Sequence, residues 1–300
     1  MTVDLRNLPA YFNSNADFQA WVQGLHAQFA AVGLVQTGDT GQINPATVAT
    51  PAGGATAGYE IWRFNDALQA TAPFFIKVEY GGNGAQGATG IGMFVTVGTA
   101  TNGAGTLTGT VGVRRNLYYS GGSSTTVGMV LASYCCSDGS GLALVTNLST
   151  TNTNFAMAVI IDRARDGSGT AQGDGVYTWL GASQASQSTV QVLPATGTAP
   201  SGFIMSASNT GIHVSPNNLV ANAVTPSVLG PNTPLLPVVF PCGKAFVSKM
   251  IHHIVASLIT SGTAFSASAM GGTHTVMPFV VHGNTVPTQA AADAMCVLWE

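Results

Sequence analysis

Glu60 and Glu79 are the carboxylates that come nearest to a catalytic pattern in this sequence. Each lies in an aromatic, apolar segment, and paired strands would bring the two side chains close enough for the general acid and base roles that glycoside hydrolysis needs. Arg63 and Lys77 lie in the same two segments, however, and cross-strand ion pairs would account for all four charges. We therefore expect these residues to be structural and the protein not to be an enzyme.

Two further groups of residues resemble metal sites. Asp162, Asp166 and Asp174 lie among glycines, but their oxygen atoms do not have the spacing of an EF-hand calcium loop, so a turn is the better interpretation. His252 and His253 are adjacent, and neighbouring side chains on a strand point to opposite faces, where they cannot share a metal ion. We expect no bound metal.

The segment Gly82–Gly87 matches the G-x-G-x-x-G pattern of dinucleotide-binding sites. That site also needs a helix directly after the glycines, because the helix N-terminus binds the pyrophosphate. The residues that follow, 91–97, have the alternation of a strand instead. The sequence therefore predicts a loop here and no cofactor.

The cysteines do not form a recognisable framework. Cys135 and Cys136 are adjacent, Cys242 and Cys296 are distant from them, and no C-x-x-C spacing occurs. Zinc spacing and a dense disulfide network are both unsupported. We expect reduced, buried thiols.

The chain is poor in charge: 7% of its 300 residues are charged, against about 25% in an average globular domain. Between Gly175 and Ala292 the only formal charges are those of Lys244 and Lys249. Hydrophobic residues make up 46% of the chain, so it has the means to fold. A surface with so little charge suits a protein that is packed against neighbours.

The same composition argues against two kinds of partner. The net charge is −3 and Arg114–Arg115 is the only adjacent basic pair, so we expect no nucleic acid partner. The sequence has no run of about 18 apolar residues, so we expect no membrane span. Met1–Pro9 also lacks the apolar segment of a secretory leader.

One convincing helix is predicted, over residues 13–33. Ser14 or Asn15 can cap its start, and Gly33 has the place of a C-terminal glycine cap. Its apolar stripe either packs on the protein's own sheet or forms an arm that docks on a neighbouring subunit. The second interpretation makes four residues a candidate subunit contact: Phe18, Trp21, Leu25 and Phe29.

The segment Gly58–Gly81 is the densest aromatic stretch, and it predicts a β-hairpin at the centre of the fold. Over Phe74–Tyr80, apolar and polar residues alternate with the period of two that is typical of a half-buried strand. Asn102–Gly103 predicts a hairpin turn. Further strands are predicted at 91–97, 107–113, 117–119, 127–136, 142–148, 155–162, 176–180, 190–193, 203–206, 235–240, 246–258, 265–269, 275–282 and 295–299.

These short strands and glycine-rich turns predict an all-β fold, a β-sandwich or jelly-roll-like architecture with one N-terminal α-helix. We expect a helix and an extended connection over residues 1–57 and a β-rich domain over 58–300. An alternative divides that domain into two subdomains near 166–175, where Asp and Gly suggest a loop. Residues 207–234, rich in Pro, Asn and Thr, predict a long irregular excursion, and a short helix is the alternative to a strand over 247–258.

Several phrases of the sequence resemble virion structural proteins of tailed bacteriophages. They are Gly33–Asn44, Gly58–Asp66, Leu68–Pro73 and the turn within Asp162–Gly175. The resemblance implies a place in the particle, with tail or baseplate favoured over head decoration, and assembly in the host bacterial cytoplasm. It implies that the partners are copies of the same chain and other virion proteins. It defines no active site.

The alternative function is a receptor- or carbohydrate-binding β module at the tail tip. Aromatic residues such as Tyr118, Tyr119 and Trp179 could stack on a host surface glycan, or they could belong to the core. A glycan-degrading tail enzyme would need a carboxylate pair in a cleft, which the sequence does not indicate.

Overall fold

A computed structural model of the chain describes most of its first 182 residues and several later strands. In the strands that follow Leu180 the backbone is described, and Met250 is the one residue there whose side chain is described as well. The described residues are 1–9, 14–52, 55–82, 91–118, 130–146, 157–166, 168–182, 189–194, 205–206, 236–242, 244–255, 265–269, 272–279 and 293–298.

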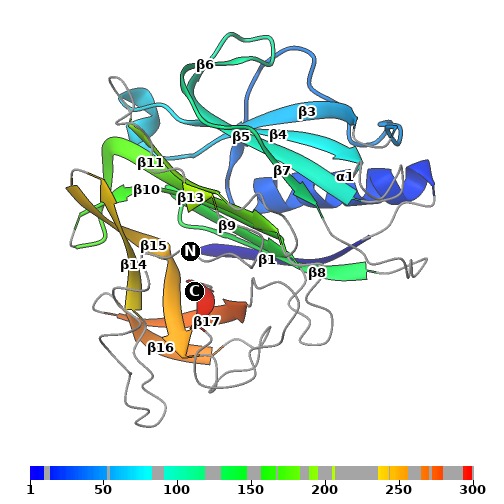
Figure 1. Cartoon of the computed structure of the whole chain (residues 1–300). Helices are drawn as coiled ribbons and strands as arrows, with labels where there is room; N and C mark the ends of the chain where they lie inside the picture. Colours follow the sequence, from blue (N-terminus) through cyan, green and yellow to red (C-terminus); the bar gives the residue numbers. More distant parts are fainter. Residues whose placement is uncertain are drawn as a thin grey trace.

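Three antiparallel sheets and one α-helix make up the described fold (Figure 1). The six-stranded sheet contains β2 (Val35–Gln36), β3 (Thr56–Arg63), β4 (Phe75–Gly82), β5 (Ile91–Thr101) and β6 (Leu107–Val111), with β7 (Arg115–Tyr118) also paired to β5. The seven-stranded sheet contains β1 (Thr2–Pro9), β8 (Val130–Ser137), β9 (Gly141–Thr146), β10 (Met157–Arg165), β11 (Ala171–Ala182), β12 (Thr189–Pro194) and β13 (Met205–Ser206). The five-stranded sheet has the order β14 (Leu236–Cys242), β15 (Lys244–Val255), β18 (Asp293–Leu298), β17 (Gly272–Phe279) and β16 (Phe265–Ala269). The predicted all-β class with one N-terminal helix is confirmed.

The helix α1 (Asn15–Ala31) begins and ends as its sequence predicts. The Ser14 hydroxyl accepts a hydrogen bond from the Asp17 N–H, which satisfies one of the free donors of the first turn. At the other end Gly33 has a φ of 87°, and the Leu34 N–H donates to the Phe29 carbonyl. This is the glycine-terminated cap that closes many helices.

The helix lies between the six-stranded and seven-stranded sheets (Figure 1). On one side the Trp21 ring meets the Tyr80 ring of β4 edge to face, with centroids 5.7 Å apart. On the other side the Gln28 amide donates to the Ser133 carbonyl of β8 at 2.8 Å. A side chain at Gly24 would collide with Leu8 of β1, so glycine allows the helix to approach that strand closely. The helix therefore fills part of the space between two sheets.

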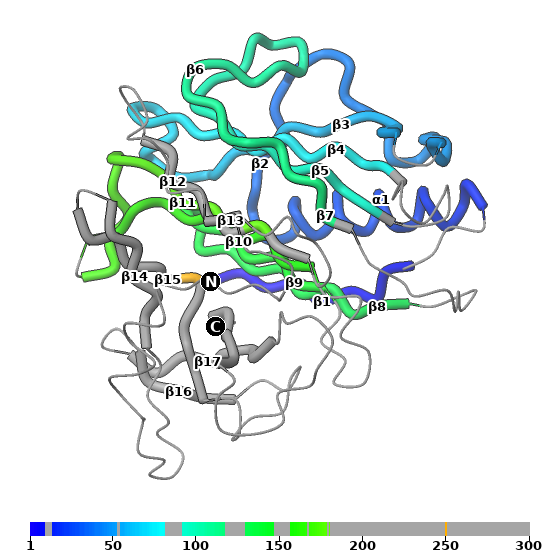
Figure 2. The backbone as a smooth tube through the Cα atoms, in the orientation of Figure 1, coloured from blue at the N-terminus to red at the C-terminus, as the bar shows by residue number. Residues whose placement is uncertain are grey.

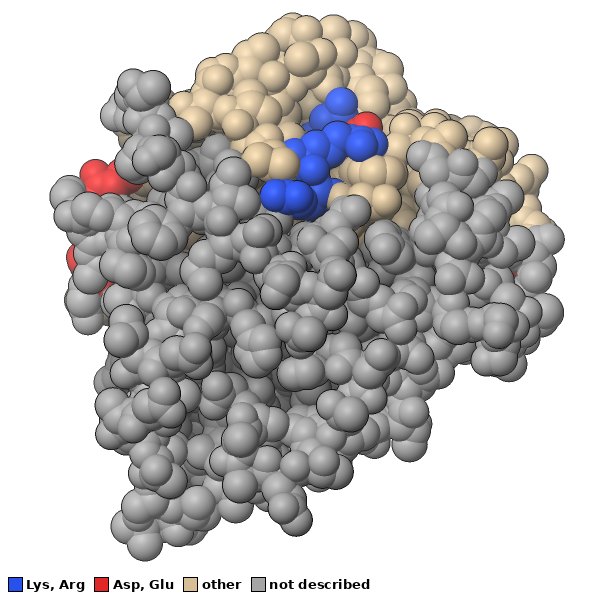
Figure 3. Space-filling model, in the orientation of Figure 1, with Lys and Arg blue, Asp and Glu red and all other residues tan. Residues whose placement is uncertain are grey.

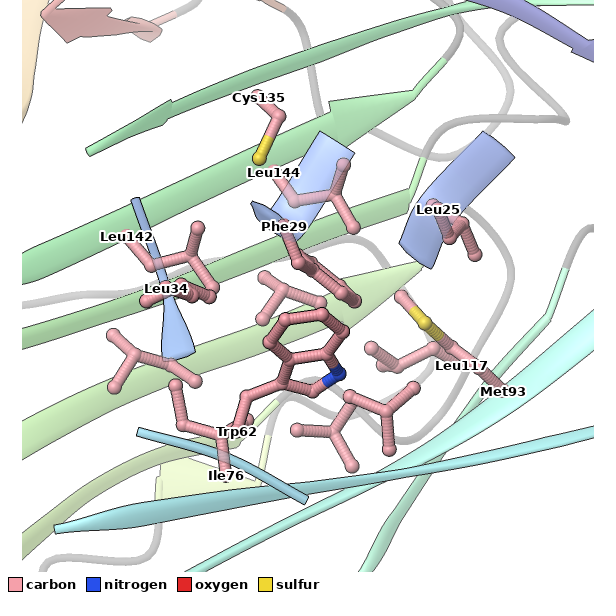
Figure 4. Close-up of a cluster of buried hydrophobic side chains, with 14 of the residues drawn as sticks. Leu25, Phe29, Leu34, Trp62, Ile76, Met93, Leu117, Cys135, Leu142 and Leu144 are labelled. Carbon is pink, nitrogen blue, oxygen red and sulfur yellow. The ribbon is translucent and has the colours of Figure 1, made fainter. Parts of the chain in front are cut away.

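The main core surrounds this helix (Figure 4). Trp62 of β3 lies opposite Ile76 of β4, and its ring packs against Phe29 with centroids 5.5 Å apart. The predicted hairpin and its inward face are thereby confirmed, with buried side chains at Phe74, Ile76, Val78 and Tyr80.

The candidate subunit contact on the helix is corrected by this packing. The four side chains are 0–2% exposed within the protein's own core, so a neighbouring subunit cannot reach them. Of the two interpretations of the stripe, the structure shows the internal one. The residues concerned are Phe18, Trp21, Leu25 and Phe29.

The five-stranded sheet meets the opposite face of the seven-stranded sheet. Met250 of β15 is fully buried, and it lies so close to Gly141 of β9 that a side chain there would come within 2.8 Å of it. Residues 247–255 thus form a strand, not the alternative helix. The predicted excursion at 207–234 lies outside the described residues.

Two boundaries considered from the sequence do not separate the sheets. The alternative split near 166–175 falls at a hairpin turn, because β10 runs to Arg165, β11 begins at Ala171, and the two strands pair. The two sides of that turn therefore share one sheet. Residues 1–57 are not separate from the β-rich part either, since β1, which the sequence did not predict, joins one sheet and β2 joins another.

Candidate functional site

Glu60 is fully buried between the helix and the six-stranded sheet. Its carboxylate lies 2.7 Å from His26 Nδ1 and accepts from the Tyr80 hydroxyl at 2.5 Å and from Trp62 Nε1 at 3.3 Å. Burial, reinforced by the Glu60 charge, raises the pKa of Tyr80 well above its usual value. Three partners account for this carboxylate, and His26 is a hydrogen-bonded polar residue of the structure.

Glu79 cannot act together with Glu60. In the register of β3 and β4, Glu79 lies opposite Tyr59 while Glu60 lies opposite Val78, so the two carboxylates point to opposite faces of the sheet. The Arg114 guanidinium donates to Glu79 at 2.6 Å and stacks over the Phe94 ring at 3.6 Å. This register rules out a shared acid–base site for the two glutamates.

The cross-strand ion pairs expected within the hairpin do not form. The Lys77 ammonium donates to the Gly105 carbonyl at 2.8 Å and lies over the Tyr59 ring. Arg63 donates to the carbonyl of Phe64. These charges have structural contacts, as predicted, but the predicted partners are wrong, because His26, Tyr80 and Trp62 bind Glu60 while Arg114 binds Glu79.

Arg163 of β10 crosses the space between two sheets. Its side chain is 1% exposed, and its guanidinium donates to both carboxylate oxygens of Asp66, with Nη2 3.0 Å from Oδ1. It also donates to the Ala72 carbonyl at 2.8 Å and to the Gln69 side chain at 3.3 Å. These three partners flank or belong to the short 3-10 helix (Ala67–Ala70) that joins β3 to β4. Arg163 therefore fixes the six-stranded sheet to the seven-stranded one.

Arg165 lies two residues further along and binds a different set of groups. It donates to Asp162 at 2.7 Å and to Asp138 in the β8–β9 turn at 2.9 Å. Burial alone would lower the pKa of Arg165, but the charges of Asp162 and Asp138 outweigh it and raise the pKa. The strand register shifts between Arg163 and Arg165, an irregularity of the kind that redirects side chains.

Asp166 organises the turn between β10 and β11. Its Oδ1 accepts from the Ser168 hydroxyl at 2.6 Å and from the backbone N–H groups of Ser168 and Thr170. The Ser168 hydroxyl is the main cause of a lowered pKa at Asp166. The carboxylate thus makes the turn, which agrees with the prediction of a turn here. Among the described residues, no group of three His, Cys, Asp or Glu side chains could hold a metal ion.

The segment 37–42, part of the first phrase with a resemblance, is a folded loop with a structural role. The Asp39 carboxylate accepts from the hydroxyls of Thr37 and Thr101 and from the Gly105 N–H. Gln42 donates to the Asp39 carbonyl and accepts from the Ile61 N–H at 2.7 Å. The loop therefore joins β3 to the tip of the β5–β6 hairpin, a role that could not be predicted from spacing alone.

The remaining expectations about binding residues have separate outcomes. β5 begins at Ile91 as a strand, so no helix follows the glycine motif, most of which lies outside the described residues. The side chains of Tyr118, Tyr119 and Trp179 also lie outside them. Cys135 and Cys136 are buried. No helix in the described part of the chain is long and apolar enough to cross a membrane.

Much of the small complement of charge is turned inward. Five charged side chains are buried among the described residues: Asp39, Glu60, Asp162, Arg163 and Arg165. Figure 3 shows one group of basic side chains beside an acidic one on a face where the other described residues are largely neutral. The sequence is charge-poor, and the fold removes further charge from its surface.

Exposed apolar side chains lie along the β1 edge of the seven-stranded sheet, from one end of the strand to the other. Leu5 of β1 and Val130 of β8 are each 57% exposed, and Met1 is 41% exposed. Leu5 lies opposite Tyr134, and Pro9 lies opposite Val130, so these residues share one face of the β1–β8 pair. This apolar edge is the clearest candidate for an interaction surface.

Comparison with protein-family models and with curated proteins finds no relative of this chain. No protein-family model matches the chain, and no curated protein matches its sequence.

Proposed function

We propose that this chain is a non-enzymatic structural subunit of a bacteriophage virion that assembles with copies of itself and with other particle proteins. Tail or baseplate is favoured over head decoration. The observation that carries the proposal is the inward placement of charge in a chain that is already charge-poor. Repulsion between like charges keeps free proteins apart, and a surface with little charge suits one that neighbours cover.

The geometry of the charged residues also favours a structural role over catalysis. Glu60 is held by three partners, and the guanidinium groups of Arg163 and Arg165 bind carboxylates and carbonyls of the same chain. Such groups hold layers together, and their hydrogen bonds are made within the chain. The phrases that resemble virion proteins include the Asp39–Gln42 loop, which likewise serves the fold.

The test is whether the chain belongs to particles. Virions of the phage whose genome encodes this chain would be purified through successive density gradients and probed with an antibody against it. We expect a constant ratio of the chain to the major particle proteins, with gold label at the tail or baseplate in negative-stain images. Loss of the antibody signal from the particle fraction would refute the proposal.

The same preparation distinguishes the receptor-binding alternative. A glycan array and a host-cell binding assay with the purified chain would reveal a carbohydrate-binding module. We expect no saturable binding to either, because we assign the chain to assembly. Saturable binding that a free sugar competes away would favour the alternative.

A further inference from the structure

The strand β1 forms one end of the seven-stranded sheet. Among the strands that the structure describes, β1 pairs with β8 alone (Figure 2). Thr2, Leu5 and Asn7 are exposed along it. A strand at a sheet edge presents unpaired N–H and C=O groups, which another strand can bind. The edge of β1 is therefore chemically suited to accept a further strand.

The sequence of β1 is complementary to itself. In antiparallel pairing about a two-fold axis perpendicular to the sheet, residues on the same face lie opposite one another. With Leu5 on the axis, Asp4 lies opposite Arg6 of the second copy, and Arg6 opposite Asp4. Centring the axis on Asp4 or on Arg6 would place two like charges opposite each other, which destabilises a strand pair. Charge therefore selects the register centred on Leu5.

The same register covers the exposed apolar edge. Leu5 would lie against Leu5 of the second copy, and Met1 of that copy would lie opposite Pro9, beside Val130. Met1, Leu5 and Val130 are three of the five large hydrophobic side chains that are exposed among the described residues. One pairing register thus satisfies the charges and buries the apolar surface.

We propose that β1 pairs with β1 of a second copy, antiparallel and with Leu5 on the two-fold axis, and so joins two seven-stranded sheets edge to edge. In the single chain Arg6 Nε lies 2.7 Å from Asp4 Oδ1 of the same strand. In the dimer this ion pair is replaced by two ion pairs, each joining Asp4 of one copy to Arg6 of the other. The inference rests on the self-assembly part of the proposed function and specifies its contact. Its test uses the purified chain, so its outcome is separate from that of the particle experiment.

The first experiment measures mass in solution by sedimentation equilibrium at micromolar concentration, on protein without an N-terminal tag. We expect a wild-type dimer of the 30.5 kDa chain. Arg6→Asp places like charges opposite each other at both pairs and should weaken dimerisation about tenfold or more. The charge swap Asp4→Arg with Arg6→Asp restores opposite charges and should recover the dimer. Arg114→Asp, which changes another exposed, ion-paired arginine, should have no effect.

The second experiment tests the register. Leu5→Cys should form a disulfide-linked dimer under mild oxidation, because the two residues face each other on the axis. Asn7→Cys should not, since the two copies of residue 7 would be about 14 Å apart along the strands. The wild-type chain, treated alike, controls for its own cysteines, of which Cys135 and Cys136 are buried.

Three outcomes would overturn the inference. One is a monomeric wild-type chain, which would indicate that β1 has another occupant or none. Another is an oligomer whose mass does not respond to Arg6→Asp in a chain whose circular dichroism and melting temperature are unchanged. The third is cross-linking through position 7 but not through position 5. None of them would alter whether the chain is found in purified particles.

Discussion

Arg163 and Arg165 lie two residues apart on β10, yet they bind carboxylates on different sides of that strand. Arg163 binds Asp66 in the connection of the six-stranded sheet, and Arg165 binds Asp162, the residue whose side chain points away from that of Arg163. The shift in register between the two arginines makes this possible. A single strand thereby contributes charged contacts on both of its faces.

Removing Asp66 should destabilise the protein strongly. Asp66→Ala leaves the Arg163 guanidinium buried without its carboxylate, which should lower the free energy of unfolding by about 3 kcal/mol. Urea denaturation followed by tryptophan fluorescence measures the change. The double variant Asp66→Ala with Arg163→Met should lose less, because it buries no unpaired charge.

The exposed pair of Arg114 and Glu79 is the matched control. Its arginine side chain is 47% exposed, so Arg114→Met should cost about 1 kcal/mol or less. If Asp66→Ala cost no more than this control, the Arg163 contact would contribute little to holding the two sheets together.

Asp39 should contribute to the pH dependence of stability. Burial favours a raised pKa, but hydrogen bonds from Thr101, Thr37 and the Gly105 N–H outweigh it, so the pKa lies below the ordinary value of 3.8. A lowered pKa in the folded state stabilises the protein above about pH 4, and this contribution is lost as pH falls through the folded value. Asp39→Asn should therefore be less stable than the wild type at pH 6, and the difference should shrink toward pH 3. Urea midpoints across this range measure it, and a constant difference would contradict the prediction.

The buried thiols should be slow to react. Burial raises the pKa of Cys135 and of Cys136, which keeps both as thiols and away from reagents at pH 8. A thiol titration should detect four free thiols in denaturant without reductant, matching the four cysteines of the chain. In the native protein, Cys135 and Cys136 should react far more slowly than they do in denaturant. Fewer than four in denaturant would reveal a disulfide.

Deleting residues 293–300 should make the protein insoluble. The deletion removes β18, which lies between β15 and β17 inside the five-stranded sheet, so each neighbour would lose one of its two partners and the sheet would be split. The soluble fraction after expression measures the effect, with deletion of Glu300 alone as the control. A soluble truncated chain with an unchanged melting temperature would contradict the role of β18.

The elements that the sequence predicts well have a strong local pattern. The hairpin of β3 and β4 follows a period of two, and α1 combines an apolar stripe with Ser14 and Gly33 at its ends. The stripe shows that one face of the helix is covered, but it cannot show by what. Strands of two sheets cover it, through contacts such as those of Trp21 with Tyr80 and Gln28 with Ser133 that are distant in sequence, and only the folded chain reveals them.

The elements that the sequence misses depend on distant partners. In β1 the burial pattern does not alternate regularly, so nothing local distinguishes it from a loop. The segment containing Arg163 and Arg165 resembles a loop in sequence. Its charged side chains would be costly to bury without partners, so they suggest exposure to solvent. Carboxylates at Asp66 and Asp138 neutralise them, and neither is near in sequence.

The pairing of β1 with β8 has a consequence for synthesis. β1 leaves the ribosome well before β8, which begins only at Val130. At roughly 5–20 residues per second, the first strand waits about 6–26 s before its partner emerges. Until β8 emerges, β1 lacks the strand with which it pairs in the folded chain. The delay places closure of the seven-stranded sheet late in translation, after the six-stranded sheet has been made.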